Sequence, residues 1–416
     1  MAVTSLDITA FDALLKTVYD TRGIEDLVYP KNPTLAMIPK NEAFTGDAKK
    51  IPVIIGNPQG RSASFSTAQT NQTNGTYEAF LIKRVSDYQL ANINNETIKA
   101  SKGDEGAFMQ SSTTVISQCL ANLGRSLAVA MFLDGSGSIG QVEASSGTVV
   151  TLTSAEDVAH FEVGQTLVAA PTSTGAVRAG TMVITAVDRI AGTFTCAGGL
   201  VAGLSVNDYL FVQGDAQNGA GSSVRIQGFA AWLPFGASAI ASNDSFWGVN
   251  RSVDRTRLGG IYYDATSEPI EEALIDLAEL ISREGGEPGV CVMSHKQWAN
   301  LKKAVQGRGA IDLGKVKASS ESGAEISFRS ITVATGAGDI EVVADVNCPT
   351  GYAYMLEMDS WCLESLGKAP DLLDYMDGLK AMRNPSQDSI ELRAGYYGNI
   401  SCNAPGHNGV MKLPSI

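Results

Sequence analysis

The stretch Gly289-Val-Cys-Val-Met-Ser-His-Lys-Gln-Trp298 combines a strand pattern with the start of a helix. Its apolar run, Val290 to Met293, follows a glycine and is typical of a buried strand. Ser294 and Gln297 have the spacing of a capping box, in which both side chains bond to backbone amides of the first helical turn. We expect Trp298 to be buried on that turn. The stretch therefore predicts a strand that leads directly into a helix, within a fold that mixes α and β structure.

The flanking residues extend this mixed pattern in both directions. Upstream, Ser267 is a suitable N-cap for a helix with Pro269 in its first turn and Gly285-Gly286 after its end. Downstream, the polar residues 306–324 are expected to form a loop. Beyond this loop, strands are predicted at residues 340–343, 352–356 and 389–397.

Residues 142–214 have a different pattern, in which short apolar runs are separated by Gly and Asp. The absence of a helical period among these runs favours a small β-barrel or sandwich. The glycine-rich residues 214–223 follow the module, so we expect it to be inserted into a larger fold. Its strands are predicted at residues 149–153, 166–169, 182–187, 193–196 and 209–212.

A long helix and a polar hairpin are predicted before this module. The helix covers residues 104–133, with Asp104 as its N-cap. Asn74-Gly75 lies within the polar residues 56–100 and is favoured in a type I′ turn, which predicts a hairpin whose second strand begins at Thr76. A two-stranded hairpin with few apolar partners is marginally stable alone in water. We therefore expect a neighbouring molecule to stabilise it.

The N-terminal residues also predict an extended arm rather than a compact domain. A short helix is expected after Thr9, and the prolines between residues 30 and 39 exclude a helix there. The candidates for contact with another copy of the chain lie on this arm and on the hairpin. They are Phe11, Leu14, Asn74, Gly75, Tyr77, Phe80 and Lys83.

Composition and charge exclude several classes of protein. The net charge of -13 argues against a protein that grips nucleic acid, because neutralising phosphates requires clustered Lys and Arg. No apolar run is long enough to span a membrane, and the N-terminus does not have the pattern of a signal peptide. The six cysteines form no C-x-x-C pair and are expected to be buried, reduced thiols, which fits synthesis in the cytosol.

Asp134-Gly-Ser-Gly-Ser138 has the Asp-x-Ser-x-Ser pattern with which von Willebrand factor A-type domains hold a divalent cation. Asp134, Ser136 and Ser138 are therefore the candidate metal ligands. That fold needs the motif between a strand and a helix, whereas here a predicted helix precedes it. The overlapping residues 135–140 match G-x-G-x-x-G, which requires the same context to bind a dinucleotide. A glycine-rich turn is the favoured interpretation.

The sequence predicts neither an active site nor a cofactor. The three histidines, His160, His295 and His407, are dispersed and are interpreted as structural rather than as zinc ligands or catalytic bases. The sequence contains no G-x-S-x-G, Walker A or H-E-x-x-H motif. We therefore expect a protein that is not an enzyme.

The order of the predicted elements resembles that of tailed-bacteriophage major capsid proteins of the Hong Kong 97 type. The shared order is a helical N-terminal arm, a polar hairpin arm, a long spine helix, a mixed α and β region, and terminal strands. Residues 289–298 are similar to the family's strand that leads to a capped helix with a tryptophan in its first turn. Residues 389–397 are placed like its closing strand. The resemblance covers most of the chain.

The resemblance implies an α+β fold of the Hong Kong 97 type with a small all-β insertion domain. Each part corresponds to a segment of this sequence. The parts are an N-terminal arm over residues 1–55, an extended β-hairpin loop over 56–100, a peripheral domain over 101–140 and 379–416 that contains the spine helix 104–133, the insertion domain over 141–224, and an axial domain over 225–378.

The resemblance also implies a function. It implies a structural subunit that self-assembles into hexamers and pentamers of an icosahedral or prolate phage head in the host cytoplasm. The shell would enclose double-stranded DNA without sequence-specific binding. Portal and decoration proteins are the implied partners, with a separate scaffolding protein or none, because the chain begins almost directly with the arm. Some members join subunits through a Lys to Asn isopeptide bond; Lys83 lies on the hairpin arm, but no motif here supports that chemistry.

Two alternatives stay open at this point. One is an encapsulin-like protein compartment, which neighbouring genes for a cargo enzyme would distinguish from a phage head. The other is a metal-dependent adhesion domain built on Asp134, Ser136 and Ser138, which calorimetry with magnesium or manganese would test.

Overall fold

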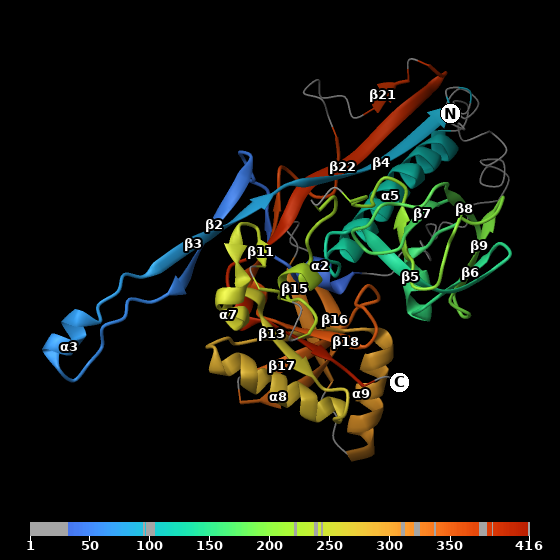
Figure 1. The fold of residues 1–416 in the computed structure, drawn as a ribbon. Helices are drawn as coiled ribbons and strands as arrows, with labels where there is room; N and C mark the ends of the chain where they lie inside the picture. The colour runs from blue at the N-terminus through green and yellow to red at the C-terminus, as the bar shows by residue number, and fades with distance from the viewer. Residues whose placement is uncertain are drawn as a thin grey trace.

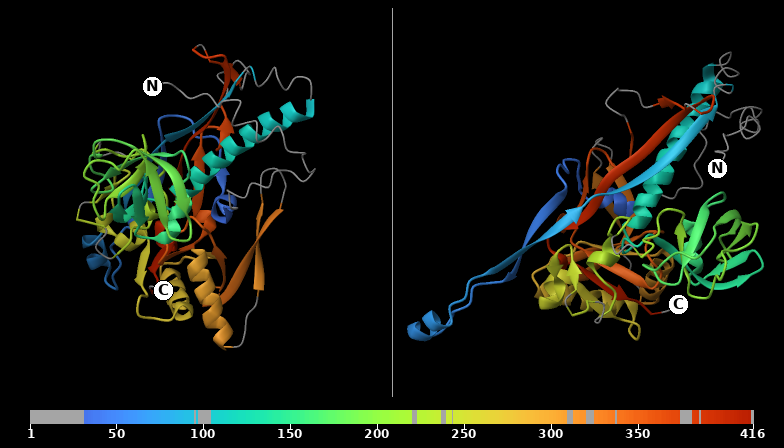
Figure 2. Two further views of the ribbon diagram at one scale, coloured as in Figure 1. Left: turned by 90° about the vertical axis from the view of Figure 1, so that its right-hand side faces the viewer. Right: turned by 45° about the horizontal axis from the view of Figure 1, so that its top comes forward.

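The described chain consists of a central body from which two extensions project (Figure 1). One extension is a thin, two-stranded arm and the other is a compact β-barrel, and the views in Figure 2 show the same separation. Within the described ranges, no helix has both the length and the apolar character needed to cross a membrane. The computed structural model describes residues 32–94, 96, 105–219, 223–236, 240–242, 244–308, 313–319, 325–336, 338–373, 381–384 and 386–414.

The largest sheet of the body is mixed, and its strand β14 is buried on both faces. Its strand order is β13-β23-β18-β14-β17-β16-β15. Successive side chains of a strand point to opposite faces, so Cys291 and Met293 pack on one side of β14 and Val292 on the other. The strands are β13 (Ile261–Asp264), β14 (Val290–Met293), β15 (Leu313–Ser319), β16 (Glu325–Thr335), β17 (Gly338–Ala344), β18 (Tyr352–Leu356) and β23 (Gly409–Lys412).

Two helices, α8 (Ile270–Arg283) and α9 (His295–Arg308), pack on one face of this sheet. The helix that follows β14 is thus where residues 289–298 predict it. Only half of the capping box forms, because the Gln297 amide donates to Ser294 Oγ at 3.4 Å while the Gln297 side chain donates to the carbonyl of Pro414. Ser267 is not the N-cap of α8; Pro269 is, without a side-chain bond.

The predicted loop over residues 306–324 is wrong at two places. The helix α9 continues to Arg308, and residues 313–319 form β15, which pairs with β16. This strand lies at the edge of the sheet, where no other described strand pairs with one of its sides. A polar edge strand lacks the apolar run that marks a buried strand, so the sequence does not distinguish it from a loop.

The second sheet of the body is built around one long strand, β22 (Ser389–Cys402), which pairs antiparallel with β4 (Val85–Asn94). The spine helix α5 (Glu105–Ala130) lies along these two strands, as Figure 2 shows. It agrees with the predicted helix 104–133, although Asp104 lies outside the described residues. The sheet also contains β1 (Lys40–Asn41), β19 (Trp361–Ser365), β20 (Asp371–Leu372) and β21 (Ala381–Arg383).

The β module is a closed barrel, one of the two predicted alternatives, with strand order β10-β5-β6-β9-β8-β7. Closure leaves no free strand edge, and the inward-facing side chains form an apolar cluster of their own. The sequence does not reveal β5, because this strand begins within the glycine-rich residues. The strands are β5 (Ser138–Ser146), β6 (Val149–Leu152), β7 (Thr166–Ala170), β8 (Met182–Asp188), β9 (Thr193–Ala197) and β10 (Tyr209–Val212), with the 3-10 helix η2 (Ala155–His160) after β6.

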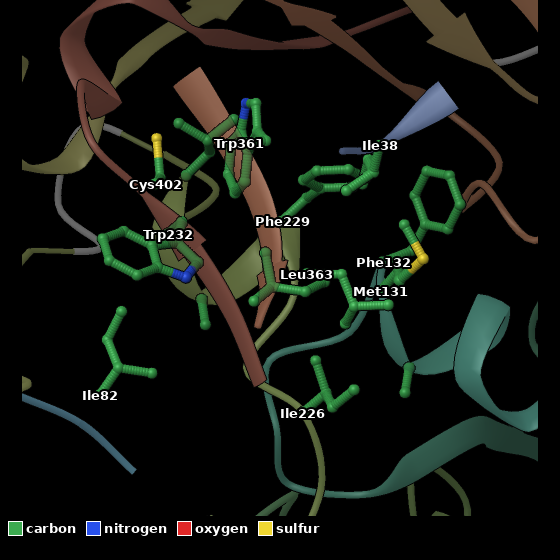
Figure 3. Close-up of a cluster of buried hydrophobic side chains, with 14 of the residues drawn as sticks. Ile38, Ile82, Met131, Phe132, Ile226, Phe229, Trp232, Trp361, Leu363 and Cys402 are labelled. Carbon is green, nitrogen blue, oxygen red and sulfur yellow. The ribbon is translucent and has the colours of Figure 1, made fainter. Parts of the chain in front are cut away.

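Short elements fill the space between the sheets and meet in the main core. Figure 3 shows Trp232, Phe229 and Trp361 at its centre, beside Phe132 from the turn that follows the spine helix. The ring centroids of Phe229 and Trp361 are 4.8 Å apart in an edge-on arrangement, which aromatic quadrupoles favour. The short elements are α2 (Pro33–Met37), α6 (Phe229–Trp232), β11 (Ser245–Phe246), β12 (Val249–Asn250), η3 (Arg251–Val253), α7 (Arg255–Gly259), η4 (Met358–Ser360) and η5 (Pro405–His407).

One predicted domain boundary does not follow the sheets. Residues 379–416 are expected to belong together, but β22 lies in the second sheet and β23 lies in the seven-stranded sheet. The strands β19 and β20, which fall in the predicted axial segment 225–378, pair with β22. The chain crosses between the sheets more than once near its end, so a single boundary at residue 379 does not separate their strands.

Candidate assembly interface

The arm is a long antiparallel hairpin of β2 (Ala48–Gly56) and β3 (Thr76–Lys83), with a short helix α3 (Phe65–Thr70) at its tip (Figure 1). Ala48 pairs with Lys83 at the root, and Gly56 pairs with Thr76 at the far end. The predicted turn at Asn74-Gly75 is wrong, because residues 57–75 together connect the strands. The partner of β3 lies further upstream than a two-residue turn allows, so the hairpin starts before the predicted boundary at residue 56.

The root of the arm belongs to the core of the body. Phe80 and Ile82 on β3 are fully buried, and Ile51 and Val53 on β2 are buried beside them. The ring centroid of Phe80 lies 5.1 Å from that of Trp232 in an edge-on contact. The amide of Leu81 donates to the carbonyl of Trp247, at 2.9 Å. These contacts tie the inner half of the arm to its own chain.

Buried polar contacts fix the direction in which the arm leaves the body. Glu364 is 2% exposed and accepts hydrogen bonds from Lys49 on the arm and from Asn41 on β1, at 2.5 and 2.7 Å. The guanidinium of Arg84 donates to the carbonyl of Phe44, and the Asn399 side chain donates to the carbonyl of Lys83, both at 2.9 Å. A buried carboxylate that lost its cation would be costly, so the Lys49–Glu364 pair resists a change in the arm's direction.

The outer half of the arm exposes apolar side chains. Phe65 on α3 is 82% exposed, Tyr77 on β3 is 66% exposed and Ile54 on β2 is 56% exposed. No residue of α3 is buried. An exposed aromatic residue at the end of a fixed, extended arm loses its contact with water when another surface covers it, which is favourable.

The tip carries almost no charge. Arg61 is the only charged residue among residues 57–77, which are otherwise rich in Ser, Thr, Asn and Gln. Contacts made by such a tip depend on apolar burial and hydrogen bonds, so we expect them to be insensitive to salt.

The structure separates the residues that the sequence proposes for contacts between copies. Asn74, Tyr77 and Lys83 are exposed on the arm, and Gly75 is partly exposed. Phe80 is not available to a neighbour, because the body of its own chain buries it completely. Phe11 and Leu14 lie outside the described residues.

Phe65 and Glu364 are the important residues that sequence reasoning missed. Phe65 is a single aromatic residue in a polar tract, so it produces no apolar period. The one available signal is that Phe65 stands alone among small polar residues, where an aromatic side chain has no local partner. Glu364 meets Lys49 and Asn41 only because the sheets bring distant segments together.

The candidate metal ligands form a hydrogen-bonded turn between α5 and β5. The Ser136 amide donates to the Asp134 carboxylate at 2.9 Å, and the Ser138 amide donates to Ser136 Oγ at 3.4 Å. Gly135 and Gly137 have φ of 85° and 88°, which favours glycine. The turn leads from a helix into a strand, the reverse of the order in a von Willebrand A-type domain. The adhesion-domain alternative is therefore wrong for this fold.

The histidines and cysteines are held in structural roles. His160 Nδ1 lies 3.1 Å from the carbonyl of Ile139, and burial lowers the pKa of His160 to about 4, so the ring is neutral at neutral pH. His295 begins α9, and His407 lies 3.0 Å from the Glu357 carboxylate. All six cysteines are free thiols, and burial raises the pKa of each one.

Comparison with known proteins gives matches in structure only. Neither a protein-family model nor a curated protein sequence matches this chain. The capsid asymmetric unit of cyanophage A-1(L) is similar, with a TM-score of 0.56, 11% identity, and coverage of 97% of this chain and 98% of that chain. The capsid of the empty GTA particle has a TM-score of 0.50 and 11% identity, with 100% of both chains covered. The holo-SrpI encapsulin complex of Synechococcus elongatus PCC 7942 has a TM-score of 0.47 and 8% identity, over 99% of this chain and 96% of that chain.

Proposed function

We propose that this chain, which has the Hong Kong 97-type fold of phage capsid subunits, is the structural subunit of a phage head. It assembles with copies of itself into hexamers and pentamers of a closed shell. The observation that carries the proposal is the arm, which is fixed in the core at its root and exposes Phe65 and Tyr77 at its outer end.

The arm suits a contact in which one copy reaches a different surface of the next copy. Such head-to-tail contacts produce rings and shells when the rotation between copies closes. Each arm contact is small, but a subunit in a shell is held by several contacts at once, so the assembled shell is far more stable than any pair. Because the root directs the arm before assembly, little ordering entropy is lost there when the tip binds.

The acidic character of the chain fits a container for DNA. A net charge of -13 favours repulsion between the shell and packaged phosphates, which leaves double-stranded DNA mobile and bound without sequence preference.

The proposed site of assembly is the host cytoplasm, with portal, decoration and scaffolding proteins as further partners. The barrel is proposed to be an insertion domain on the exterior of the shell. A strongly basic inner face in a structure of the shell would refute the proposed repulsion between the shell and packaged DNA.

Removal of the arm tip tests the proposal. In the variant, a two-residue Asn-Gly turn replaces residues 57–75 and connects Gly56 to Thr76. These two residues already pair with each other across the strands. This change leaves Phe80 and the root in place. We expect the variant to fold but to stay unassembled in sedimentation velocity, while the full chain forms large, closed particles.

Two outcomes would lead to other conclusions. Normal shells from the variant would contradict a role for the arm in assembly. Shells of the full chain that enclose a cargo enzyme in place of DNA would identify an encapsulin-like compartment instead of a phage head.

A further inference from the structure

The barrel stands apart from the body in its apolar packing. Its inward-facing residues, among them Val142, Phe161 and Leu210, form one cluster, whereas the two clusters of the body consist of residues from other elements. Two segments of chain connect the parts, one before β5 and one after β10. A domain with a closed core and two connections can move as a rigid body when the contacts at its surface are weak.

The two connections meet at one point. Gly137, in the first connection, has φ of 88°, and a Cβ atom built there would lie 2.0 Å from the carbonyl oxygen of Asp215 in the second. Only glycine allows the two backbones to approach this closely. Gly135 and Gly214 next to this crossing also have positive φ. The barrel could therefore rotate relative to the body about this crossing, because the glycines beside it can adopt many backbone conformations.

Two charged pairs join the barrel to the body. Arg125 on α5 lies 2.6 Å from the Glu162 carboxylate of the barrel. Lys296 on α9 lies 3.0 Å from Glu156 on η2, and this cation lowers the pKa of Glu156 against the opposing effect of burial. Both pairs are partly exposed to water. Ion pairs of this kind contribute little to stability and are screened by salt.

The space between the barrel and the spine helix is incompletely filled and has both polar and apolar walls. A cavity of about 100 Å³ lies there, lined by Arg125, His160, Glu162 and Arg225 among others. His160 Nε2 is buried and has no hydrogen-bond partner in the described structure. An interface with a cavity and an unpaired acceptor lacks the dense packing that fixes two parts of one core.

We propose that the barrel is a latched rigid body, which pivots at the crossing of Gly137 and Asp215 and is held in place by the Arg125–Glu162 and Lys296–Glu156 pairs. Screening or removal of these pairs releases the barrel while both cores stay folded. The device does not depend on the proposed assembly function, because every group it uses belongs to one chain.

Distance measurement by fluorescence energy transfer on the unassembled full chain tests the latch. One dye is placed on the barrel by Ile190→Cys, which is 96% exposed, and the other on α8 by Ile275→Cys. The native thiols have raised pKa values and label slowly; Cys362, the one that is partly exposed, is replaced by Ser. We expect the distance distribution to broaden and shift to longer values at about 1 M salt, where the screening length falls to about 3 Å.

Substitutions separate the latch from general effects of salt. Glu156→Gln with Glu162→Gln is expected to give the broad distribution at low salt. Glu143→Gln, at an exposed glutamate of the same barrel, is the matched control and is expected to leave the distribution unchanged. The charge exchange Glu156→Lys with Lys296→Glu is expected to retain the narrow distribution.

A dye pair within the barrel, Ile190→Cys with Val206→Cys, shows whether the barrel itself stays folded. This pair is expected to keep one narrow distribution in every variant. A barrel-to-body distance that does not change in the double glutamine variant or at high salt would overturn the proposal. Broadening of the pair within the barrel would also overturn it, because the barrel would then unfold rather than pivot.

Discussion

The arm and the barrel both project from the same body, but they are stabilised in opposite ways. The barrel encloses its own apolar cluster and has no free strand edge. The arm has no core of its own; its inner half uses the core of the body and its outer half exposes Phe65 and Tyr77 to solvent. One extension is thus complete within the chain, whereas the other leaves apolar surface exposed to solvent.

The largest effect on stability is expected from a substitution at the root of the arm. Phe80→Ala removes a fully buried ring from the main core, so we expect a loss of about 3–5 kcal/mol in the free energy of unfolding. Chemical denaturation followed by tryptophan fluorescence measures this loss. Tyr77→Ala on the same strand is the matched control, with an expected change within about 0.5 kcal/mol, because its side chain is exposed. Equal losses in both variants would mean that the root is not part of the core.

The outer half of the arm is expected to affect assembly and not folding. Phe65→Ser removes the most exposed aromatic contact of the tip, so we expect a higher protein concentration to be needed for assembly, with an unchanged melting temperature. Light scattering against protein concentration measures this threshold. Ile190→Ser on the barrel removes an apolar residue that is even more exposed than Phe65 and is expected to leave the threshold unchanged. A shift with Ile190→Ser alone would place the contact on the barrel.

Deletion of the barrel is expected to have a smaller effect on the body. Replacing residues 138–212 with a short Gly-Ser linker removes the apolar clusters of the barrel and leaves the two clusters of the body intact. All four tryptophans lie outside the deleted segment, so their fluorescence reports on the body alone. We expect the unfolding midpoint of the body in denaturant to change little. A body that no longer unfolds cooperatively would show that the barrel is part of the same folding unit.

The smallest expected effect concerns cysteine reactivity. Burial raises the pKa of Cys196 in the barrel to about 11 and that of Cys291 in the body to about 12. At pH 8 both thiols are protonated and unreactive, and the thiolate fraction increases as the pH rises toward each pKa. We expect Cys196 to be alkylated before Cys291 in mild denaturant, because the barrel opens independently. Mass spectrometry of alkylated peptides measures the order, and simultaneous labelling would contradict independent opening.

The sequence is informative where apolar residues follow a clear period. The helix α8, the strands β6 to β10 and the strand-to-helix step at residues 289–298 could all be predicted, because burial on one or both faces imposes their pattern. The edge strand β15 and the glycine-rich start of β5 lack that pattern and were missed. The partner of β3 could not be predicted either, since pairing across residues 57–75 depends on contacts distant in sequence.

The candidate interface was predictable in outline but not in detail. The polar character of residues 56–100 indicates an extended arm, and Tyr77 is exposed on it as expected. Phe80 was misassigned, because an apolar residue on an arm can face either a neighbour or its own core, and only the position of Trp232 decides between them. The tie between Lys49 and Glu364 joins two residues that no local pattern relates.

Electron cryomicroscopy of assembled particles tests the central claim most directly. We expect closed shells in which residues 57–75 of each copy lie against another copy, with the Phe65 ring covered there and the Phe80 ring still in its own core. Shells in which the tip stays in solvent or folds back onto its own body, or a full chain that stays monomeric at every concentration, would contradict it.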